Sequence, residues 1–153
     1  MEIKTERLTL RPATEEEMLA LVAGAEDEDL KAAYQEMYDG CVRNPAEKQW
    51  YAPWTIENGG GDTVGDLGFK GITADGMVEI GYGIDEAYWG RGYATEAVIE
   101  AVKWASEQKG VTRIEAETDP DNAASQRVLQ KAGFVPLGVM GEEGPRFLWR
   151  EKK

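Results

Sequence analysis

Short segments in which apolar and polar residues alternate predict β-strands along much of the chain. Near the start of the sequence, for example, Leu8 and Leu10 stand between polar neighbours. Turn signals follow several of these segments, at NGGGD (58–62) and at Asp75-Gly76, and they indicate hairpins. The expected strands cover residues 6–12, 50–57, 63–72, 77–85, 111–118, 134–139 and 146–150.

Between residues 94 and 110 the apolar residues instead recur with the period of a helix. Thr14 followed by Glu17 matches a capping box, which predicts the start of an earlier helix. The expected helices span residues 14–24, 27–39, 94–110 and 122–132. The order β-α-α-β-β-β-α-β-α-β-β predicts an α+β domain with a mixed sheet. Because we find no repeat, low-complexity tract or linker, we expect a single domain over residues 1–153.

The chain is acidic, with 29 Asp and Glu against 17 Lys and Arg and a net charge of -12. This balance argues against nucleic acid or an anionic membrane as a partner, since both need clustered basic residues. It suits a cationic partner, or serves solubility alone. The sequence has no apolar run that would span a bilayer, no signal-peptide pattern, and a single cysteine, Cys41. We therefore expect a cytoplasmic protein.

Histidine is absent from the sequence. Its absence removes the catalytic triads that use histidine as well as the commonest metal ligand, and no metal site is expected. Any general base must therefore be a carboxylate, a tyrosine, a lysine or a chain of waters.

The strand expected over residues 77–85 has an unusual face. With a period of two, Glu79, Gly81 and Gly83 share one side, and alternate glycines leave a groove that an extended ligand or another backbone can occupy. Glu79 would stand at the edge of this groove. A bulge with a solvated glutamate is the other interpretation.

The strand leads into a glycine-containing turn, Gly90-Arg91-Gly92, and then a long helix. Glycines allow close approach of a ligand to the backbone, and the first N–H groups of a helix are free to bind an anion such as a pyrophosphate. A P-loop pattern is absent, and a dinucleotide fingerprint would need Gly or Ala where Thr95 stands. A purely structural turn remains open on this evidence.

A second segment, DPDNAASQRVLQKAGF (119–134), predicts a helix that Asn122 begins and Gly133 ends. Asn122 and Ser125 have a structural interpretation as a cap and a first-turn residue. Arg127 and Lys131, four residues apart, share a face of the helix, as surface residues commonly do.

Together these two segments resemble the GNAT superfamily of N-acetyltransferases, in particular its RimJ/RimL-like branch. The family motif Q/R-x-x-G-x-G/A is similar to WGRGYA at 89–94, with Trp89 in the first position. The second family signature, N-x-x-S/A before a helix that ends in Gly-Phe, is similar to Asn122, Ser125 and the Gly133-Phe134 pair. The resemblance covers nearly the whole chain, from TERLTLRP onward.

The resemblance implies a three-layer fold in which helices flank a V-shaped, mixed and mostly antiparallel sheet, with acetyl-CoA as co-substrate in the opening of the V. It places the pyrophosphate at the backbone of residues 91–95 and the pantetheine along residues 80–85, with Asn122 beside it and Arg127 or Lys131 near the phosphates. The implied cofactor-binding residues are Ile84, Trp89, Gly90, Arg91, Gly92, Tyr93, Ala94, Thr95, Asn122 and Arg127.

The reaction implied is direct attack of a neutral amine on the thioester in a ternary complex. Glu79 is the preferred base, directly or through water, with Glu117 behind it. Many relatives carry a tyrosine where this chain has Leu129, so Ser125 is the remaining candidate to donate to the leaving thiolate.

The resemblance also implies that the acceptor enters between the first two helices and the last hairpin. Acidic residues in both regions suggest a cationic amine: a polyamine, an aminoglycoside or a protein N-terminus. They are Glu26, Asp27, Glu28, Asp29, Glu36, Asp39, Glu142 and Glu143. A homodimer stays open, and the alternative function is a catalytically idle CoA-binding or regulatory module.

Overall fold

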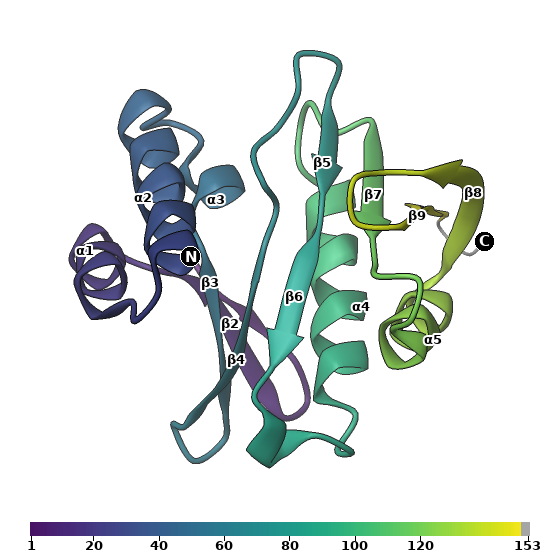
Figure 1. Ribbon diagram of the computed structural model, residues 1–153, viewed down its shortest axis with the longest axis horizontal. Helices are drawn as coiled ribbons and strands as arrows, with labels where there is room; N and C mark the ends of the chain where they lie inside the picture. Colours follow the sequence, from purple (N-terminus) through teal and green to yellow (C-terminus); the bar gives the residue numbers. More distant parts are fainter. Residues whose placement is uncertain (151–153) are drawn as a thin grey trace.

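The computed structural model describes residues 1–150 and contains two sheets with helices on both faces (Figure 1). The helices are α1 (Glu15–Gly24), α2 (Glu28–Arg43), α3 (Lys48–Tyr51), the short 3₁₀ helix η1 (Glu86–Tyr88), α4 (Tyr93–Ser106) and α5 (Ala123–Ala132). The strands are β1 (Ile3–Lys4), β2 (Leu8–Pro12), β3 (Trp54–Asn58), β4 (Thr63–Gly68), β5 (Met77–Glu79), β6 (Gly81–Ile84), β7 (Arg113–Glu117), β8 (Phe134–Met140) and β9 (Pro145–Trp149).

The first sheet has the strand order β1-β2-β3-β4-β6, and every neighbouring pair in it is antiparallel. The second has the order β5-β7-β9-β8, in which only β5 and β7 run parallel. Because β5 and β6 follow one another along the chain, the two sheets are joined there and diverge beyond it. The α+β fold with a mixed, mostly antiparallel sheet is thus confirmed.

The main core lies between the sheets and α4. The buried face of α4 carries the small and β-branched residues of its apolar stripe, which pack against large side chains from the strands. Trp50, Trp54 and Phe69 gather around Trp104 with ring centroids 5.1–5.7 Å apart. The small α4 residues let the helix lie close beneath the sheet. They are Ala97, Val98, Ala101, Val102 and Ala105.

The opposite face of the first sheet holds α1. Thr14 and Glu17 form the expected capping box at its start. Arg11 of β2 donates to both oxygens of Glu17, at 2.8 and 2.9 Å, and this contact lowers the pKa of Glu17 to about 2. Met18 of α1 packs on Cys41 of α2 in a small second core. Cys41 is therefore a buried packing residue, and burial raises the pKa of its thiol.

Several boundaries differ from the sequence prediction, including the ends of β4 at Gly68 and of α4 at Ser106, each four residues earlier than expected. The expected strand over 50–57 is wrong at its start, because Trp50 and Tyr51 end the short helix α3 and the strand begins at Trp54. The helix expected to end near Asp39 continues to Arg43. The single strand expected over 77–85 is divided at Ile80, where the chain leaves one sheet for the other. Each of these boundaries depends on tertiary contacts, which the local pattern of apolar residues does not reveal.

Candidate active site

The site begins where the two sheets separate. The Ile80 N–H still donates to the Glu115 carbonyl of β7 at 2.9 Å, but the next residues pair only with β4. Further on, the Asp85 N–H donates to the Val64 carbonyl at 2.8 Å. Beyond Ile80, β6 therefore has one edge bonded to β4 and one edge that pairs with no other strand within residues 1–150.

The register of β6 shows which backbone groups the free edge presents. Asp85 bonds to Val64, and residues of an antiparallel pair alternate between bonded and non-bonded positions. The N–H and C=O groups of Tyr82 and Ile84 consequently point away from β4. The Ile84 carbonyl is already engaged, since it accepts from the Trp89 indole N–H at 2.6 Å. An extended ligand can form with this free edge the backbone hydrogen bonds that a neighbouring strand would otherwise make.

The start of α4 faces this edge. Gly92 is the N-cap with φ 78° and offers no side-chain cap, which leaves the first N–H groups of the helix to another acceptor. Gly90 also has a positive φ, 79°, and a Cβ placed there would meet no atom within 4 Å. Arg7 is held beside the turn by Glu96, which accepts from its backbone N–H and its Nε. The start of a helix with uncapped N–H groups is in general an arrangement that suits an anion.

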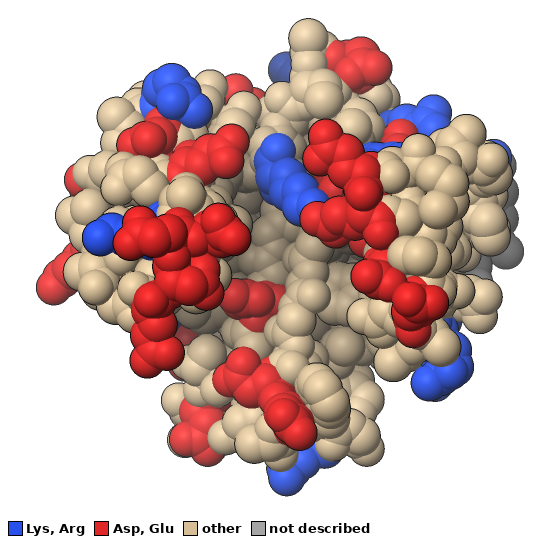
Figure 2. All heavy atoms as spheres, viewed as in Figure 1, with Lys and Arg blue, Asp and Glu red and all other residues tan. Residues whose placement is uncertain are grey.

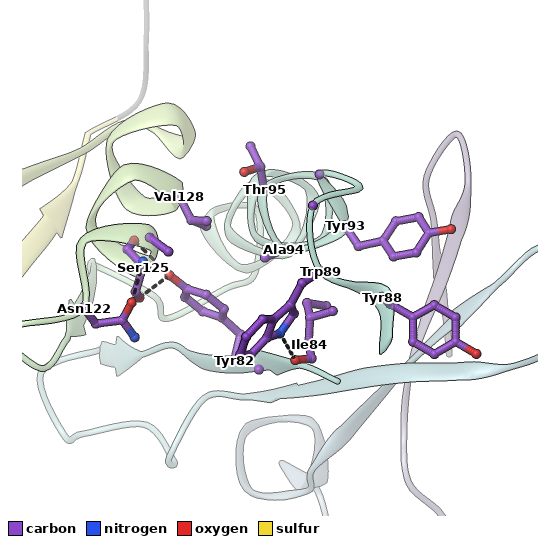
Figure 3. A pocket seen from close by; sticks show the side chains of 14 residues that line it. Tyr82, Ile84, Tyr88, Trp89, Tyr93, Ala94, Thr95, Asn122, Ser125 and Val128 are labelled. Carbon is purple, nitrogen blue, oxygen red and sulfur yellow. Dashed lines mark hydrogen bonds between the residues drawn. The ribbon is translucent and has the colours of Figure 1, made fainter. Parts of the chain in front are cut away.

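A cavity of about 480 Å³ lies between this helix start, the free edge of β6 and the first turn of α5 (Figure 3). Its lining includes eight of the ten residues expected to bind cofactor, and also Ser125. These eight are Ile84, Trp89, Gly90, Gly92, Tyr93, Ala94, Thr95 and Asn122.

The two expected arginines lie outside the lining. The Arg91 guanidinium stands over the Tyr88 ring, 5.4 Å from its centroid, and Arg127 is on the exposed face of α5. The family resemblance had implied that Arg127 or Lys131 lies near the phosphates. The sequence analysis overlooked Arg7, whose Nη2 lies 3.5 Å from the position of a Cβ on Gly92. No local signal indicates Arg7, because only the pairing of β1 and β2 brings it to α4.

At the α5 end of the cavity, Asn122 caps the helix by accepting from the Ser125 N–H at 3.0 Å. The Ser125 hydroxyl is 2.7 Å from the hydroxyl of Tyr82, which the sequence analysis did not single out. Burial raises the pKa of Tyr82. Leu129, one turn further along α5, is fully buried in the core. Tyr82 and Ile84, two residues apart on β6, both line this cavity.

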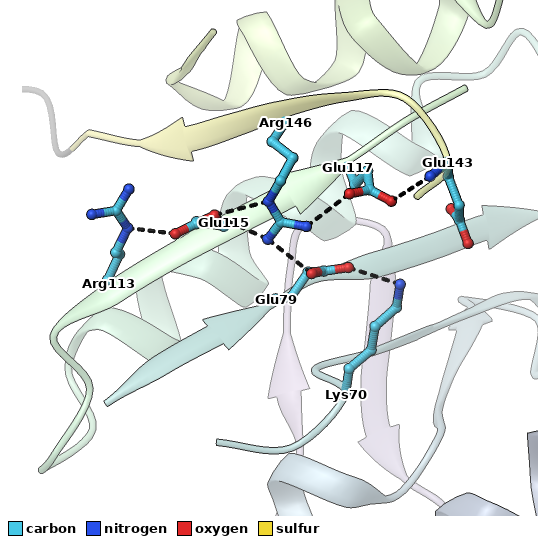
Figure 4. A network of polar contacts seen from close by, with 7 residues as sticks. All are labelled: Lys70, Glu79, Arg113, Glu115, Glu117, Glu143 and Arg146. Atoms are coloured by element: carbon cyan, nitrogen blue, oxygen red, sulfur yellow. Dashed lines mark hydrogen bonds and ion pairs between the residues drawn. The ribbon is translucent and has the colours of Figure 1, made fainter. Parts of the chain in front are cut away.

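Glu79 lies at the point where the sheets separate, in a network of charged side chains (Figure 4). One carboxylate oxygen accepts from Arg146 at 2.9 Å and the other from Lys70 at 2.8 Å. Arg146 also holds Glu115, at 2.9 Å. Both oxygens of Glu79 are thus occupied, and the side chain of one of the two cations, Lys70, is half exposed.

Glu117, the second candidate base, is in the same network. It accepts from Arg146 at 2.8 Å and from the backbone N–H of Glu143 at 2.9 Å. The Glu143 N–H and Arg146 lower the pKa of the Glu117 carboxyl. Glu117 is therefore a weaker base than an unpaired glutamate.

A second cavity of about 220 Å³ lies on the other side of β6, between that strand, β4, α2 and α3. Tyr82 and Gly83 line both cavities, so they meet at β6. Asp66 of β4 also faces the second cavity, and partial burial, with a further contribution from the charge of Asp85, raises the pKa of Asp66. Lys70 reaches this cavity as well.

Acidic side chains stand on both sides of the hollow above this region (Figure 2). The acidic residues expected at the rim are exposed or half-buried, and Asp27 also caps α2 by accepting from the Leu30 N–H at 2.7 Å. Among the described residues that line the second cavity, the carboxylate is Asp66, which the sequence analysis did not identify. Within residues 1–150, no cluster of three or more potential metal ligands occurs, and no helix has the length and apolarity to cross a membrane.

The family described as "Acetyltransferase (GNAT) domain" matches residues 7–135 of the chain. Among curated proteins, the uncharacterized N-acetyltransferase YoaA of Bacillus subtilis (strain 168) is 30% identical, with 90% of this chain and 85% of YoaA covered. YjdG of the same strain, also an uncharacterized N-acetyltransferase, is 33% identical over 61% of this chain. The chain spans only about half of YjdG, 56% of its length.

Two solved structures illustrate the likeness of fold. An acetyltransferase from Agrobacterium tumefaciens has a TM-score of 0.76 at 20% identity, with 99% of this chain and 95% of the other covered. RimL, a ribosomal alpha-N-protein acetyltransferase, in complex with coenzyme A has a TM-score of 0.72 at 20% identity, with 97% and 96% covered. At this identity the likeness concerns the fold.

Proposed function

Because the chain belongs to the GNAT acetyltransferase family, we propose that it transfers an acetyl group from acetyl-CoA to a primary amine of a cationic acceptor. The observation that carries the proposal is the pair of cavities that meet at β6, where Tyr82 and Gly83 line both. One cavity suits a long phosphate-bearing donor and the other a small cation. We also assign the chain to the RimJ/RimL-like branch, which the likeness to RimL supports.

The first cavity fits acetyl-CoA at both of its ends. The uncapped start of α4, from Gly92 to Thr95, would bind the pyrophosphate through backbone N–H groups, with Arg7 beside it. The free edge of β6 at Tyr82 would hydrogen-bond the pantetheine in the manner of an added strand. Bound acetyl-CoA supplies a thioester whose acyl carbon accepts the amine.

The second cavity favours a cationic acceptor. Asp66 faces it and the hollow above is bordered by acidic side chains (Figure 2). The Lys70 ammonium, 2.8 Å from Glu79, already shows that an alkylammonium fits at this carboxylate. An acceptor amine that displaces Lys70 would occupy the same place, next to the strand shared by the two cavities.

In this mechanism the chain provides a base on one side of the thioester and a donor on the other. Glu79 takes the proton from the acceptor nitrogen once Lys70 has moved away, while Arg146 keeps the other carboxylate oxygen fixed. Ser125 donates a hydrogen bond to the leaving sulfur at the α5 end. The leaving thiol has an ordinary pKa of about 8.5, so it needs only modest help.

The test is a thiol-release assay with acetyl-CoA against polyamines, aminoglycosides, peptides with free N-termini and uncharged amines, with mass spectrometry of each product. We expect thiol release only with an amine present and a cationic amine as the best acceptor. Preference for an uncharged amine would contradict the assignment of the second cavity. If CoA raises the melting temperature while no amine releases thiol, the chain is instead an idle CoA-binding module.

A further inference from the structure

Two hydroxyl groups from distant parts of the chain meet inside the first cavity. The Tyr82 ring extends from β6 to the first turn of α5, where its hydroxyl lies 2.7 Å from the Ser125 hydroxyl and 3.2 Å from the Ser125 carbonyl oxygen (Figure 3). The two residues are 43 positions apart and both line the cavity. The contact therefore joins β6 to α5 inside the cavity, and neither element forms it alone.

The two hydroxyl groups have only two protons to donate between them. Each hydroxyl has one proton, and either atom of the 2.7 Å contact can be the donor. A serine in the first turn of a helix can also direct its proton back to a carbonyl of the preceding turn. If Tyr82 donates to Ser125, the serine oxygen is already an acceptor and its own proton is free for a third partner in the cavity.

The chemistry of the two hydroxyls favours Tyr82 as the donor of their 2.7 Å contact, because a phenol is a stronger acid than the aliphatic hydroxyl of Ser125. The phenol carries its proton at neutral pH, since its ordinary pKa is about 10 and burial raises the pKa of Tyr82 further. The helix offers no hydroxyl of its own one turn on, because that position is Leu129, with 0% of its surface exposed. At this end of the cavity, Ser125 thus relies on a donor from β6 to fix its orientation.

We propose that Tyr82 is a positioning residue that donates to Ser125 and directs the serine proton toward the sulfur of CoA. The inference rests on the proposed function, in which the amine nitrogen bonds to the acyl carbon, the C–S bond breaks and its electron pair stays on sulfur. The amine proton passes to Glu79, and CoA leaves as a thiolate that the Ser125 proton stabilises. Tyr82 itself does not touch the sulfur.

One test needs no acceptor and therefore separates this inference from the proposed function. The thiol of bound CoA is titrated by its thiolate ultraviolet absorbance, as the difference between protein with and without CoA. In the parent the bound thiol should ionise at a lower pH than the thiol of free CoA in the same buffer, and in Tyr82→Phe the value should return toward that of free CoA. A thiol pKa that is the same in the parent and Tyr82→Phe would overturn the proposal.

The second test is a double-mutant cycle on the single-turnover rate with a working acceptor. Tyr82→Phe should lower the rate about 3- to 10-fold, as for one lost hydrogen bond, with the KM for acetyl-CoA unchanged. In the Ser125→Ala background the same change should have little further effect. Tyr38→Phe, which removes a hydroxyl that donates to Glu15 outside the lining of both cavities, is the matched control and should leave the rate unchanged. Additive losses, or a loss confined to KM, would overturn the proposal.

Discussion

The two cavities that meet at β6 are built in different ways. Most of the lining of the first comes from two continuous segments, Tyr82–Thr95 and Asn122–Val128, whose backbone provides much of the chemistry. The second draws on α2, α3, β4 and β6, and side chains such as Asp66 give it its character. We call the first the donor cavity and the second the acceptor cavity, after the roles proposed for them. The donor cavity depends on local backbone geometry, whereas the acceptor cavity depends on which distant side chains the fold brings together. We therefore expect substitutions in the two cavities to change different measured properties.

The largest effect is expected at Glu79, whose partner Lys70 lines the second cavity. Glu79→Gln keeps the size of the side chain but cannot accept a proton, so kcat should fall by about 10²–10⁴-fold. The loss should shrink at high pH, where more of the acceptor is already neutral. The measurement is kcat against pH with one saturating amine.

The matched control for Glu79 is Glu115→Gln. Glu115 accepts from the same Arg146 at 2.9 Å. Neither glutamate lines a cavity, but Glu79 contacts Lys70 of the second cavity, whereas Glu115 contacts Arg113. Glu115→Gln should lower the melting temperature with little change in kcat. Equal kcat losses in the two variants, with parallel pH profiles, would show that Glu79 serves the ion-pair network and is not the base.

In the donor cavity, Gly92→Val should abolish the stabilisation by CoA, because the side chain would fill the space at the start of α4. At a CoA concentration of 100 times the Kd, the parent should gain about 2.7 kcal/mol, or roughly 5–10 °C in melting temperature. Thermal unfolding with and without CoA measures this difference.

Because Gly92 has φ 78°, valine there also strains the backbone. Gly61→Val imposes the same strain at φ 84° in an open turn remote from the cavity. It should lower the melting temperature and keep the full CoA shift. A full CoA shift in Gly92→Val would place the cofactor elsewhere.

In the acceptor cavity, Asp66→Asn should lower kcat/KM for a cationic amine by about 10-fold, the size of a lost charged hydrogen bond, and leave the CoA shift unchanged. The pKa of Asp66 is raised, so the carboxylate is ionised above that value and protonated as the pH falls through it. The difference between parent and variant should thus be greatest at neutral pH and disappear in acid. Asp62→Asn, in the turn before β4, is the control; a pH-independent difference for Asp66 would argue against binding of the cation.

The smallest effect is expected at α1, which contributes to the lining of neither cavity. Thr14→Ala removes the N-cap and should cost about 1 kcal/mol of stability, or roughly 2–4 °C in melting temperature. Kinetic constants for both substrates should be unchanged. A change in either KM would show that α1 positions the acceptor cavity through α2.

The sequence indicated the donor cavity well because its signals are local. Gly92 precedes a helical pattern, and that order by itself predicts a turn with free N–H groups at a helix start. Asn122, three residues before Ser125, predicts the cap that the structure contains. The expected roles of these residues in binding acetyl-CoA remain predictions.

The sequence could not indicate contacts that depend on strand pairing and helix docking. Nothing near Tyr82 shows that its hydroxyl meets Ser125, 43 residues away, and nothing near Arg146 shows that it joins three glutamates. Local dihedral preferences and periodicity fix single elements over a few residues. The order of strands in the two sheets determines which side chains share a cavity, and this order is decided only when the whole core packs. That packing placed Asp66 in the acceptor cavity and Glu79 between two cations.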